Sequence, residues 1–599
     1  MEKTGFPDSM GGRPESRAGI QKLFDQGQYS AAAKELAAAL REKPDDPELL
    51  LISAKLDYVS RRFDAALHTL NRVAKARPDS VDAHHLLGVL LSQAGQHAAA
   101  VQALERAYRL SPDDPQICSN LGGLIVRQDN FNDAEPLLVK ARNLDPASAD
   151  IRKNLGVLYR EQLRHEEAVQ EYRQAVALRP DRMDLRFGLV KALGLCPHTD
   201  PHEDFEVFRA SSEIIEKNAV RLFDTYAKAS NCIRIGYLGS TLRKHSVAYF
   251  LLPILEKHSD RFEIFCYHIG ELEDSMTQRI SGKSDHYRHL SGQSAESIAR
   301  QIHRDGIDIL FDLEGYSELL LTLRVLAHSP APVQVSYLGL PNTTGLARIG
   351  YRIVDCFTDP PGGIADSLYT EKLIRMSKSF AVYSAPVEAP DVKATPALRN
   401  GFITFGSFNI PSKMHQDVIK AWARVLQAVP GSRLLLKSWM FEKKSMVDNI
   451  VAGFAARGVT PERLILVGFV ESTVDHLNYY HEVDIALDPF PFNGMTTSCE
   501  ALWMGVPIVT LAGEKHLSRV GVSHLTNIGY PGWIAGNHDQ YVAIAAELAS
   551  DPDRLNAIRT GLRKKMSDSP LMDNESFTAE LEQKLMEIWR ERQACPPSS

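Results

Sequence analysis

Residues 490–513 form the segment of this sequence best suited to chemistry. They read FPFNGMTTSCEALWMGVPIVTLAG and follow a predicted strand. A turn through Asn493 and Gly494 leads into a predicted helix that opens with Thr496 and Thr497. Free backbone N–H groups and two hydroxyls at a helix N-terminus form a site for phosphate oxygens.

Glu500 comes one turn after these threonines, within reach of a ribose diol. Together they suit a nucleotide diphosphate leaving group, which becomes more negative as a glycosidic bond breaks. The alternative is a capped helix in which Thr496 or Thr497 only satisfies its own backbone. The residues of this segment leave both interpretations open.

Two basic side chains follow other predicted strands. Lys413 ends the segment FGSFNIPSK (405–413), just before a predicted helix, and can neutralise a diphosphate as a point charge. His245, in RKHSVAYF (243–250), lies beyond the carboxyl end of the first predicted strand, the edge where open α/β sheets place ligands. The alternatives are a solvated lysine and a structural histidine.

The elements that must position these residues are short strands that alternate with helical stretches. This alternation predicts parallel, doubly wound sheets. The first set of predicted strands is 233–239, 262–268, 307–313, 333–339 and 351–355, and the second is 402–408, 433–438, 464–469, 483–489 and 507–513.

A proline- and alanine-rich segment, 383–401, separates the two sets and is predicted to be a linker. We therefore expect an N-terminal Rossmann-like domain at 232–382 and a C-terminal one at 402–599 with C-terminal helices. Two Rossmann-like halves that face one cleft make the GT-B glycosyltransferase plan.

The first third of the chain repeats every 34 residues. A proline closes each period, with an alanine twelve positions before it and a small or branched apolar residue five positions before it. This pattern predicts five tetratricopeptide (TPR) repeats in a solenoid at 13–182, in which glycine and alanine let paired helices pack closely. The closing prolines are Pro44, Pro78, Pro112, Pro146 and Pro180.

Residues 183–231 lose the period and are predicted to be a helical cap and connector, and residues 1–12 are predicted to be disordered. Because stacked repeats form a separate quasi-linear unit, we expect removal of residues 1–182 to spare the catalytic half.

Composition narrows the class of protein. Hydrophobic residues make up 44%, charged residues 24%, and the net charge is −7, which argues against nucleic acid as a partner. Seven scattered cysteines indicate a reducing compartment without a zinc site. With no predicted membrane span or signal peptide, we expect no membrane association and a cytoplasmic location.

Together these motifs resemble the O-GlcNAc transferase/SPINDLY family over about residues 20–590. The resemblance rests on the TPR repeats, RIGYLGS…KHS, PAPVQVSYLGLPNTTG, ITFGSFN…K and DIALDPFPFNGMTTSCEALWMGVPIVTLAG. It implies an inverting, metal-independent transfer of a sugar from a nucleotide diphosphate to Ser or Thr of proteins, with no cofactor.

The resemblance also implies roles for individual residues. Lys413 corresponds to the diphosphate-binding lysine, and His245 to an active-site histidine proposed as the base. The remaining matches all lie at the nucleotide-sugar site: Leu338, Gly339 and Pro341 line the sugar pocket, His476 lies beside the nucleoside, Asn493, Gly494, Thr496 and Thr497 hold phosphate, and Glu500 binds ribose.

This chain departs from the animal enzymes near the donor. Met495 replaces a histidine, Glu500 an aspartate, and Tyr479 an arginine near the uracil. The run TTSCEALWMGVP is closer to the SPINDLY branch, whose plant members use GDP-fucose. We favour UDP-GlcNAc as the donor and keep GDP-fucose as the alternative.

The leading hypothesis is a protein O-glycosyltransferase whose TPR concave face recruits protein substrates. The alternatives are a catalytically dead TPR scaffold and a transferase that acts on a small molecule or glycan. The sequence leaves open whether the chain forms a homo-oligomer.

Overall fold

The computed structural model describes residues 17–222, 232–317, 320–339 and 341–594. The chain forms two compact units, residues 1–158 and 159–599. The predicted disordered segment 1–12 and the connector residues 223–231 lie outside the described residues. The predicted order of a helical repeat followed by parallel sheets is confirmed.

The first unit is a stack of antiparallel helix pairs. Four pairs lie wholly within its described residues: α1 (Arg17–Asp25) with α2 (Tyr29–Glu42), α3 (Pro47–Val59) with α4 (Phe63–Ala76), α5 (Val81–Gln93) with α6 (His97–Leu110), and α7 (Pro115–Arg127) with α8 (Phe131–Leu144). The next helix, α9 (Ala149–Glu161), crosses the boundary between the units.

Small residues set the distance within each pair, as the repeat predicts. A Cβ atom added to Gly88 would lie 2.5 Å from Cγ of Leu104, and one added to Gly122 would lie 2.8 Å from Cγ of Leu138. Each closing proline stands two residues beyond the end of the second helix of a pair, where it cannot extend that helix.

The second unit begins within the fifth predicted repeat. There α10 (His165–Leu178) packs on α11 (Met183–Leu195), and a Cβ atom on Gly188 would lie 2.2 Å from Cε1 of Tyr172. The cap continues with α12 (Pro201–Lys217), whose N-terminus is capped by the Asp200 carboxylate.

The first catalytic half is built on a seven-stranded parallel sheet in the order β3-β2-β1-β4-β5-β6-β7. In register, Tyr237 pairs with Phe311 on one side and Cys266 on the other. The strands are β1 (Ile233–Gly239), β2 (Phe262–His268), β3 (His286–His289), β4 (Ile309–Asp312), β5 (Val333–Ser336), β6 (Tyr351–Asp355) and β7 (Lys372–Met376).

The second half is built on a six-stranded parallel sheet in the order β10-β9-β8-β11-β12-β13. Its strands are β8 (Thr404–Ser407), β9 (Arg433–Lys437), β10 (Leu464–Val467), β11 (Ile485–Leu487), β12 (Ile508–Leu511) and β13 (Ile534–Ala535). All ten predicted strands are present. The sequence analysis missed the edge strands β3, β7 and β13, which are short or carry exposed polar residues.

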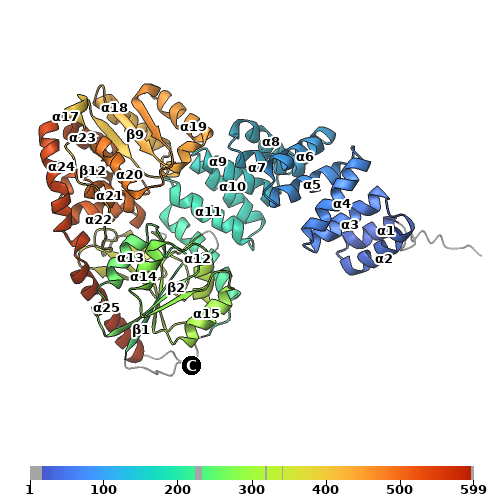
Figure 1. Ribbon diagram of the computed structural model, residues 1–599, viewed down its shortest axis with the longest axis horizontal. Helices are drawn as coiled ribbons and strands as arrows, with labels where there is room; N and C mark the ends of the chain where they lie inside the picture. The colour runs from blue at the N-terminus through green and yellow to red at the C-terminus, as the bar shows by residue number, and fades with distance from the viewer. Residues whose placement is uncertain (1–16, 223–231, 318–319, 340, 595–599) are drawn as a thin grey trace, which may run out of the picture. The chain divides into compact units, whose positions relative to one another are not determined.

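Helices cover both sheets (Figure 1). On the first half these are α13 (Ala248–Leu255), α14 (Ser275–Ser281), α15 (Ala295–Arg304) and α16 (Leu321–Ala327). On the second they are α17 (Ala397–Asn400), α18 (Gln416–Ala428), α19 (Lys444–Ala455), α20 (Thr473–Asn478), α21 (Thr496–Trp503), α22 (Val520–Asn527), α23 (His538–Ala549) and α24 (Pro552–Ser567). No helix among the described residues is long and apolar enough to cross a membrane.

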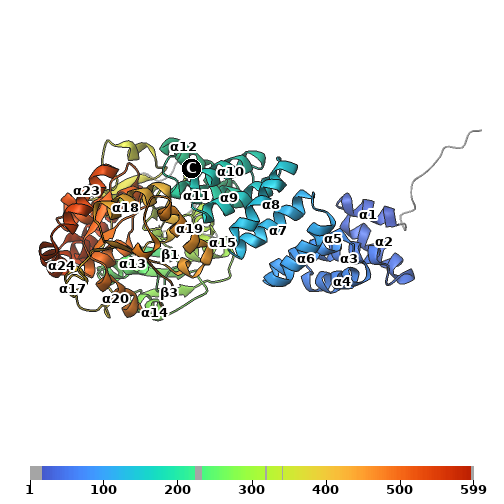
Figure 2. The same ribbon diagram turned by 90° about the horizontal axis from the view of Figure 1, so that it is seen from above.

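The last helix, α25 (Asn574–Ala594), returns to the first half, where it contacts α13 and β7. Figure 1 shows α25 beside α13, and Figure 2 shows α13 near β1 in the view from above. Its Glu582 accepts hydrogen bonds from the backbone N–H and the hydroxyl of Ser259, both at 2.8 Å. The sequence analysis had placed the C-terminal helices with the second half. In the structure α25 ties the second half back to the first.

Candidate active site

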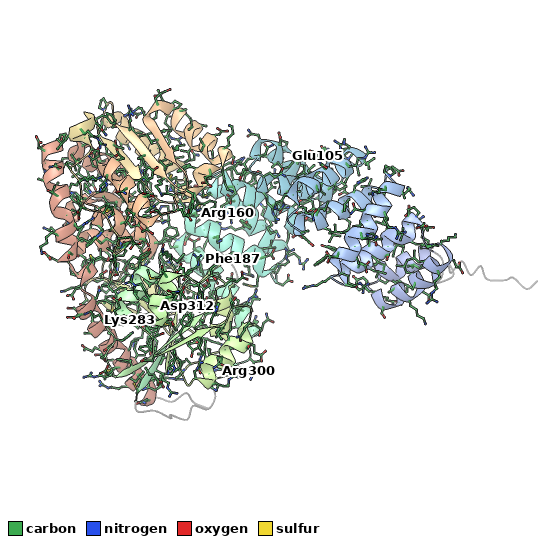
Figure 3. The ribbon with its side chains drawn as sticks, in the orientation of Figure 1. Glu105, Arg160, Phe187, Lys283, Arg300 and Asp312 are labelled. Atoms are coloured by element: carbon green, nitrogen blue, oxygen red, sulfur yellow. The ribbon has the colours of Figure 1, made fainter. Side chains whose placement is uncertain are left out.

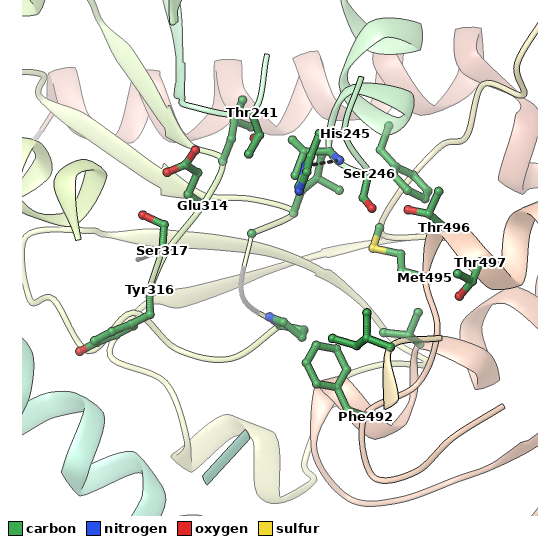
Figure 4. A pocket seen from close by; sticks show the side chains of 18 of the residues that line it. Thr241, His245, Ser246, Glu314, Tyr316, Ser317, Phe492, Met495, Thr496 and Thr497 are labelled. Atoms are coloured by element: carbon green, nitrogen blue, oxygen red, sulfur yellow. Dashed lines mark hydrogen bonds between the residues drawn. The ribbon is translucent and has the colours of Figure 1, made fainter. Parts of the chain in front are cut away.

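A cavity of about 840 Å³ lies between the two catalytic halves, within the second unit. Its walls come from loops at the carboxyl ends of strands in both sheets, and Lys191 of α11 also reaches it. Figure 4 shows Thr496 and Thr497 at one side of this cavity and Tyr316 and Ser317 at the other.

Most of the predicted site residues meet in this cavity. Those that line it are His245, Leu338, Gly339, Pro341, Lys413, Asn493, Thr496 and Thr497. His476, Gly494 and Glu500 do not line it. The arrangement gathers predicted site residues that are up to 252 positions apart, because His245 and Thr497 face the same space.

The start of α21 is held open toward the cavity. Asp488 accepts from the backbone N–H of Gly494 at 2.7 Å and from the Thr510 hydroxyl at 2.7 Å, which fixes the loop before the helix. The Thr497 hydroxyl donates to Oδ1 of Asn409 at 3.2 Å, and the buried Thr496 hydroxyl has no partner among the described residues. Neither threonine caps its own backbone, so the interpretation as a simple capped helix is not supported.

Lys413 lies directly against this helix start. Its ammonium donates to the backbone carbonyl of Asn493 at 2.8 Å and to Oδ1 of Asn409 at 3.2 Å, and lies 4.0 Å from the centre of the Phe492 ring. Burial lowers the pKa of Lys413, and the nearby Asp488 carboxylate opposes this effect. A cation beside free N–H groups favours an anion at this end of the cavity.

His245 lies in the loop between β1 and α13 and points into the cavity (Figure 4). Its Nδ1 accepts from the backbone N–H of Val247 at 3.3 Å, so the neutral ring carries its proton on Nε2. Burial, together with the positive charge of Arg243, lowers the pKa of His245 to about 4. His245 is therefore a neutral hydrogen-bond donor near pH 7.

His476 and Glu500 form a separate cluster behind one wall of the cavity. Nε2 of His476 lies 3.1 Å from Oε2 of Glu500, and the Tyr480 hydroxyl donates to the same oxygen at 3.3 Å. Lys437 at the end of β9 lies 2.7 Å from Nδ1 of His476. The ring of Phe408, which lines the cavity, packs edge-on against His476 at 5.7 Å. The cluster therefore lies behind the part of the cavity wall that Phe408 forms, and its role at a nucleoside stays a prediction.

The glycine of the predicted sugar-pocket loop makes a close backbone approach. A Cβ atom on Gly339 would lie 2.4 Å from the carbonyl carbon of Glu314. Glu314 lines the cavity and accepts hydrogen bonds from the backbone and hydroxyl of Ser240. Buried Asp312, inside the first half in Figure 3, fixes this turn by accepting from the N–H groups of Glu314 and Gly315 at 3.1 Å.

Sequence reasoning missed several cavity residues because each lacks a local motif. Glu314 stands in a loop whose fold depends on β4. Lys437, which contacts His476 and does not line the cavity, was missed as well because it appears only as the polar end of an apolar strand. The residues missed also include Lys191, Tyr316, Asn409, Phe492 and His516.

Comparisons with known proteins agree with this geometry. The family model described as Glycosyl transferase family 41 matches residues 207–385 and 391–581. Tetratricopeptide repeat models match residues 19–56, 53–115, 91–158 and 149–182. The two types of model together cover most of both units.

Curated relatives share the catalytic region. "Probable UDP-N-acetylglucosamine--peptide N-acetylglucosaminyltransferase SPINDLY" of Oryza sativa subsp. japonica is 36% identical over 433 residues, which is 70% of this chain and 46% of the relative. The Arabidopsis thaliana protein of the same description, with the name SEC, is 30% identical over 370 residues, or 60% and 37%. This chain spans less than half the length of these relatives.

A solved structure extends the likeness to the whole fold. It is a mutant of the Thermobaculum terrenum O-GlcNAc transferase, which matches with a TM-score of 0.72 and 32% sequence identity. The match covers 86% of this chain and 98% of that one.

Proposed function

Because the chain belongs to glycosyl transferase family 41, we propose that it is an inverting protein O-glycosyltransferase that moves a sugar from a nucleotide diphosphate to Ser or Thr. The proposal rests above all on the cation of Lys413 beside the open start of α21. That arrangement suits a leaving group that gains negative charge in the transition state.

The transfer can proceed without a metal ion in this proposal. Lys413 and the N–H groups of α21 supply the positive charge that a divalent cation supplies in other sites. The Thr497 hydroxyl lies beside the same loop through Asn409 and can add a hydrogen bond to phosphate. The donor diphosphate would therefore occupy the Thr496 side of the cavity.

The acceptor would occupy the opposite side, near Tyr316 and Ser317. Lys191 of α11, which follows the last predicted repeat, reaches this same cavity. Because TPR repeats form extended concave surfaces that bind other proteins, we propose a polypeptide as the acceptor.

We propose UDP-GlcNAc as the donor and keep GDP-fucose as the alternative. The descriptions of the curated relatives support the former. The nucleobase of the donor would lie near His476. There the centre of the Tyr479 ring lies 5.8 Å from the Lys437 ammonium. Calorimetric titration of UDP and GDP decides between them. A GDP affinity about tenfold higher, or about 1.4 kcal/mol, would overturn the UDP assignment.

The function itself is tested by co-expression. We expect intact-mass spectrometry to detect sugar on proteins from cells that express the wild-type chain and not from cells that express Lys413→Ala. Lys420→Ala is the matched control, since Lys420 is an exposed lysine on the nearby α18. Absence of any mass increase with the wild-type chain, despite tight nucleotide binding, would instead favour a catalytically dead scaffold.

A further inference from the structure

A buried Asp–His pair joins the two catalytic halves at the cavity wall. Nδ1 of His516 lies 2.6 Å from Oδ2 of Asp359, and the two side chains are 2% and 0% exposed. Asp359 follows β6 in the first half, whereas His516 opens a short 3₁₀ helix after β12 in the second. His516 lines the cavity, and the family resemblance assigned no role to either residue.

The surroundings of Asp359 fix its charge and orientation. Its other carboxylate oxygen accepts from the Tyr369 hydroxyl at 3.0 Å. Burial disfavours the ionised form of Asp359, but its interaction with His516 outweighs this effect, so the pKa of Asp359 lies below its ordinary value. A carboxylate only accepts hydrogen bonds, so Nδ1 of His516 must carry a proton. In the neutral imidazole the lone pair is then on Nε2.

Nε2 of His516 is free to accept a hydrogen bond or a proton from a group bound in the cavity. Within the described part of the chain, no hydrogen bond occupies this nitrogen, and the side chain borders the cavity. The next residue, Leu517, accepts at its carbonyl from the N–H of Asn493 at 3.0 Å. The Asn493 carbonyl in turn accepts from Lys413 at 2.8 Å. His516 therefore adjoins the proposed diphosphate site, where the anomeric carbon that the acceptor hydroxyl must reach is attached.

The cavity therefore contains two histidines whose neutral rings carry the proton on different nitrogens. His245 is constrained by the Val247 N–H to carry its proton on Nε2 and can only donate from that atom while neutral. His516 is constrained by Asp359 to carry its proton on Nδ1 and can accept at Nε2. Base catalysis requires an acceptor that faces the reacting hydroxyl.

We propose that His516 is the general base of the transfer and that Asp359 is its positioning residue, an inference that rests on the proposed function. Nε2 takes the proton of the acceptor hydroxyl while that oxygen forms a bond to the anomeric carbon. The bond from the anomeric carbon to the phosphate oxygen breaks, and its electron pair leaves with the nucleotide diphosphate. The Asp359 carboxylate stabilises the imidazolium, which then releases its proton to solvent.

The first test uses full-length variants with saturating donor and a peptide acceptor. His516→Gln should lower the transfer rate about 100-fold or more while nucleotide affinity stays within about threefold. Asp359→Asn should act in the same direction, because a carboxamide NH₂ that donates to Nδ1 moves the ring proton to Nε2. Nitrogen-15 chemical shifts of Asp359→Asn should report this change of tautomer, which a merely structural role of Asp359 would not produce.

His198→Gln is the matched control, since His198 also pairs with a carboxylate, that of Asp417 at 2.8 Å, but its side chain is 66% exposed and does not line the cavity. It should keep transfer within about threefold of wild type. The base assignment is overturned if His516→Gln transfers as fast as wild type, or if His198→Gln loses as much activity as His516→Gln.

A second readout does not depend on activity. Nitrogen-15 chemical shifts of the full-length protein should show His516 protonated on Nδ1 and not on Nε2 at neutral pH. A proton on Nε2 would overturn the proposal even if the variants fail to fold. If the tautomer is as expected but the wild-type chain transfers no sugar to any protein, the proposed function fails rather than the proton-accepting geometry of His516.

Discussion

The contacts that stabilise the first compact unit join residues close in sequence, whereas those that stabilise the second join residues far apart in sequence. In the first unit, Gly88 packs on Leu104 and Asn154 bonds Ser119, so partners lie within about one repeat of 34 residues. In the second unit, the Ser523 hydroxyl bonds Asp355, 168 residues away. Local periodicity therefore specifies the solenoid, whereas the catalytic unit depends on contacts that only the complete topology creates.

The boundary between the solenoid and the catalytic unit lies within the fifth repeat. Leu163, in the turn between α9 and α10, is 1% exposed and belongs to the hydrophobic core of the catalytic unit. The carbonyl of the adjacent Gln162 accepts from the Asn449 side chain of α19 at 2.8 Å. The last repeat is therefore part of the catalytic unit's core as well as of the solenoid.

The largest expected effect is on folding, and it depends on where a deletion of the solenoid ends. Deletion of residues 1–182 removes Leu163 and α10 from the catalytic core and should abolish folding, contrary to the expectation from the repeat pattern alone. Deletion of residues 1–148 should leave a folded protein that binds nucleotide. Circular dichroism and nucleotide titration of both deletions measure this. Equal nucleotide binding by the 1–182 deletion would show that the fifth repeat is dispensable.

Acid should destabilise the catalytic unit through its buried neutral histidines. Burial lowers the pKa of His165 and of His524 to about 4, against about 6.5 when unfolded. Between these values the unfolded chain binds more protons, so stability falls as pH drops from 6.5 to 4, by at most about 3 kcal/mol for each histidine. Urea titrations of the 1–148 deletion at pH 7 and pH 4.5 measure the loss.

The control for this pH effect removes one titrating group. His524→Leu should reduce the difference in unfolding free energy between the two pH values while costing stability at pH 7. An unchanged pH dependence in that variant would show that His524 does not contribute to acid sensitivity.

Loss of the Lys413 ammonium should weaken the donor site without disturbing the solenoid. Lys413→Ala removes charge-assisted contacts worth about 1.5–3 kcal/mol, which is about a 10- to 150-fold loss of nucleotide affinity. Thermal unfolding of the same variant measures how much stability depends on the Lys413 contacts with Asn493 and Asn409. Full donor affinity in Lys413→Ala, compared with Lys420→Ala, would show that the diphosphate binds elsewhere.

The candidate site shows how far the sequence alone reaches. Thr496, Thr497 and Lys413 were found because each sits in a motif of adjacent residues. His516 and Asp359 were missed because each looks ordinary in its own segment, and only pairing of the two halves brings them within 2.6 Å. The position of α25 was missed for the same reason, because its partners in the first half are distant in sequence: Ser377 lies 203 residues from Glu580, and Ser259 lies 323 residues from Glu582.

Single glycine substitutions should have different effects in the two units. Gly122→Ala should cost the first unit about 1–3 kcal/mol, because the new Cβ meets Leu138, and should leave nucleotide affinity unchanged. Gly339→Ala should displace the Glu314 backbone and lower sugar transfer. Gly194→Ala is the control, since a Cβ there meets nothing within 4 Å. Thermal unfolding and transfer assays separate the two outcomes, and equal effects of all three substitutions on transfer would contradict them.

Chelation of metal ions should have the smallest effect on the transfer rate. It tests whether the positive charge that neutralises the diphosphate comes from the protein. Lys413 and the start of α21 already face the proposed position of the diphosphate. Treatment with EDTA should therefore leave the transfer rate of the full-length protein within about twofold, because the leaving group keeps its cation and its N–H donors. The same treatment of Lys413→Ala, with and without manganese, is the informative comparison. If the ammonium does the work of a metal, added manganese should partly restore the variant and do little for the wild type. Complete loss of wild-type activity on chelation, with recovery in manganese, would mean that the donor site needs a bound metal and that Lys413 has another role.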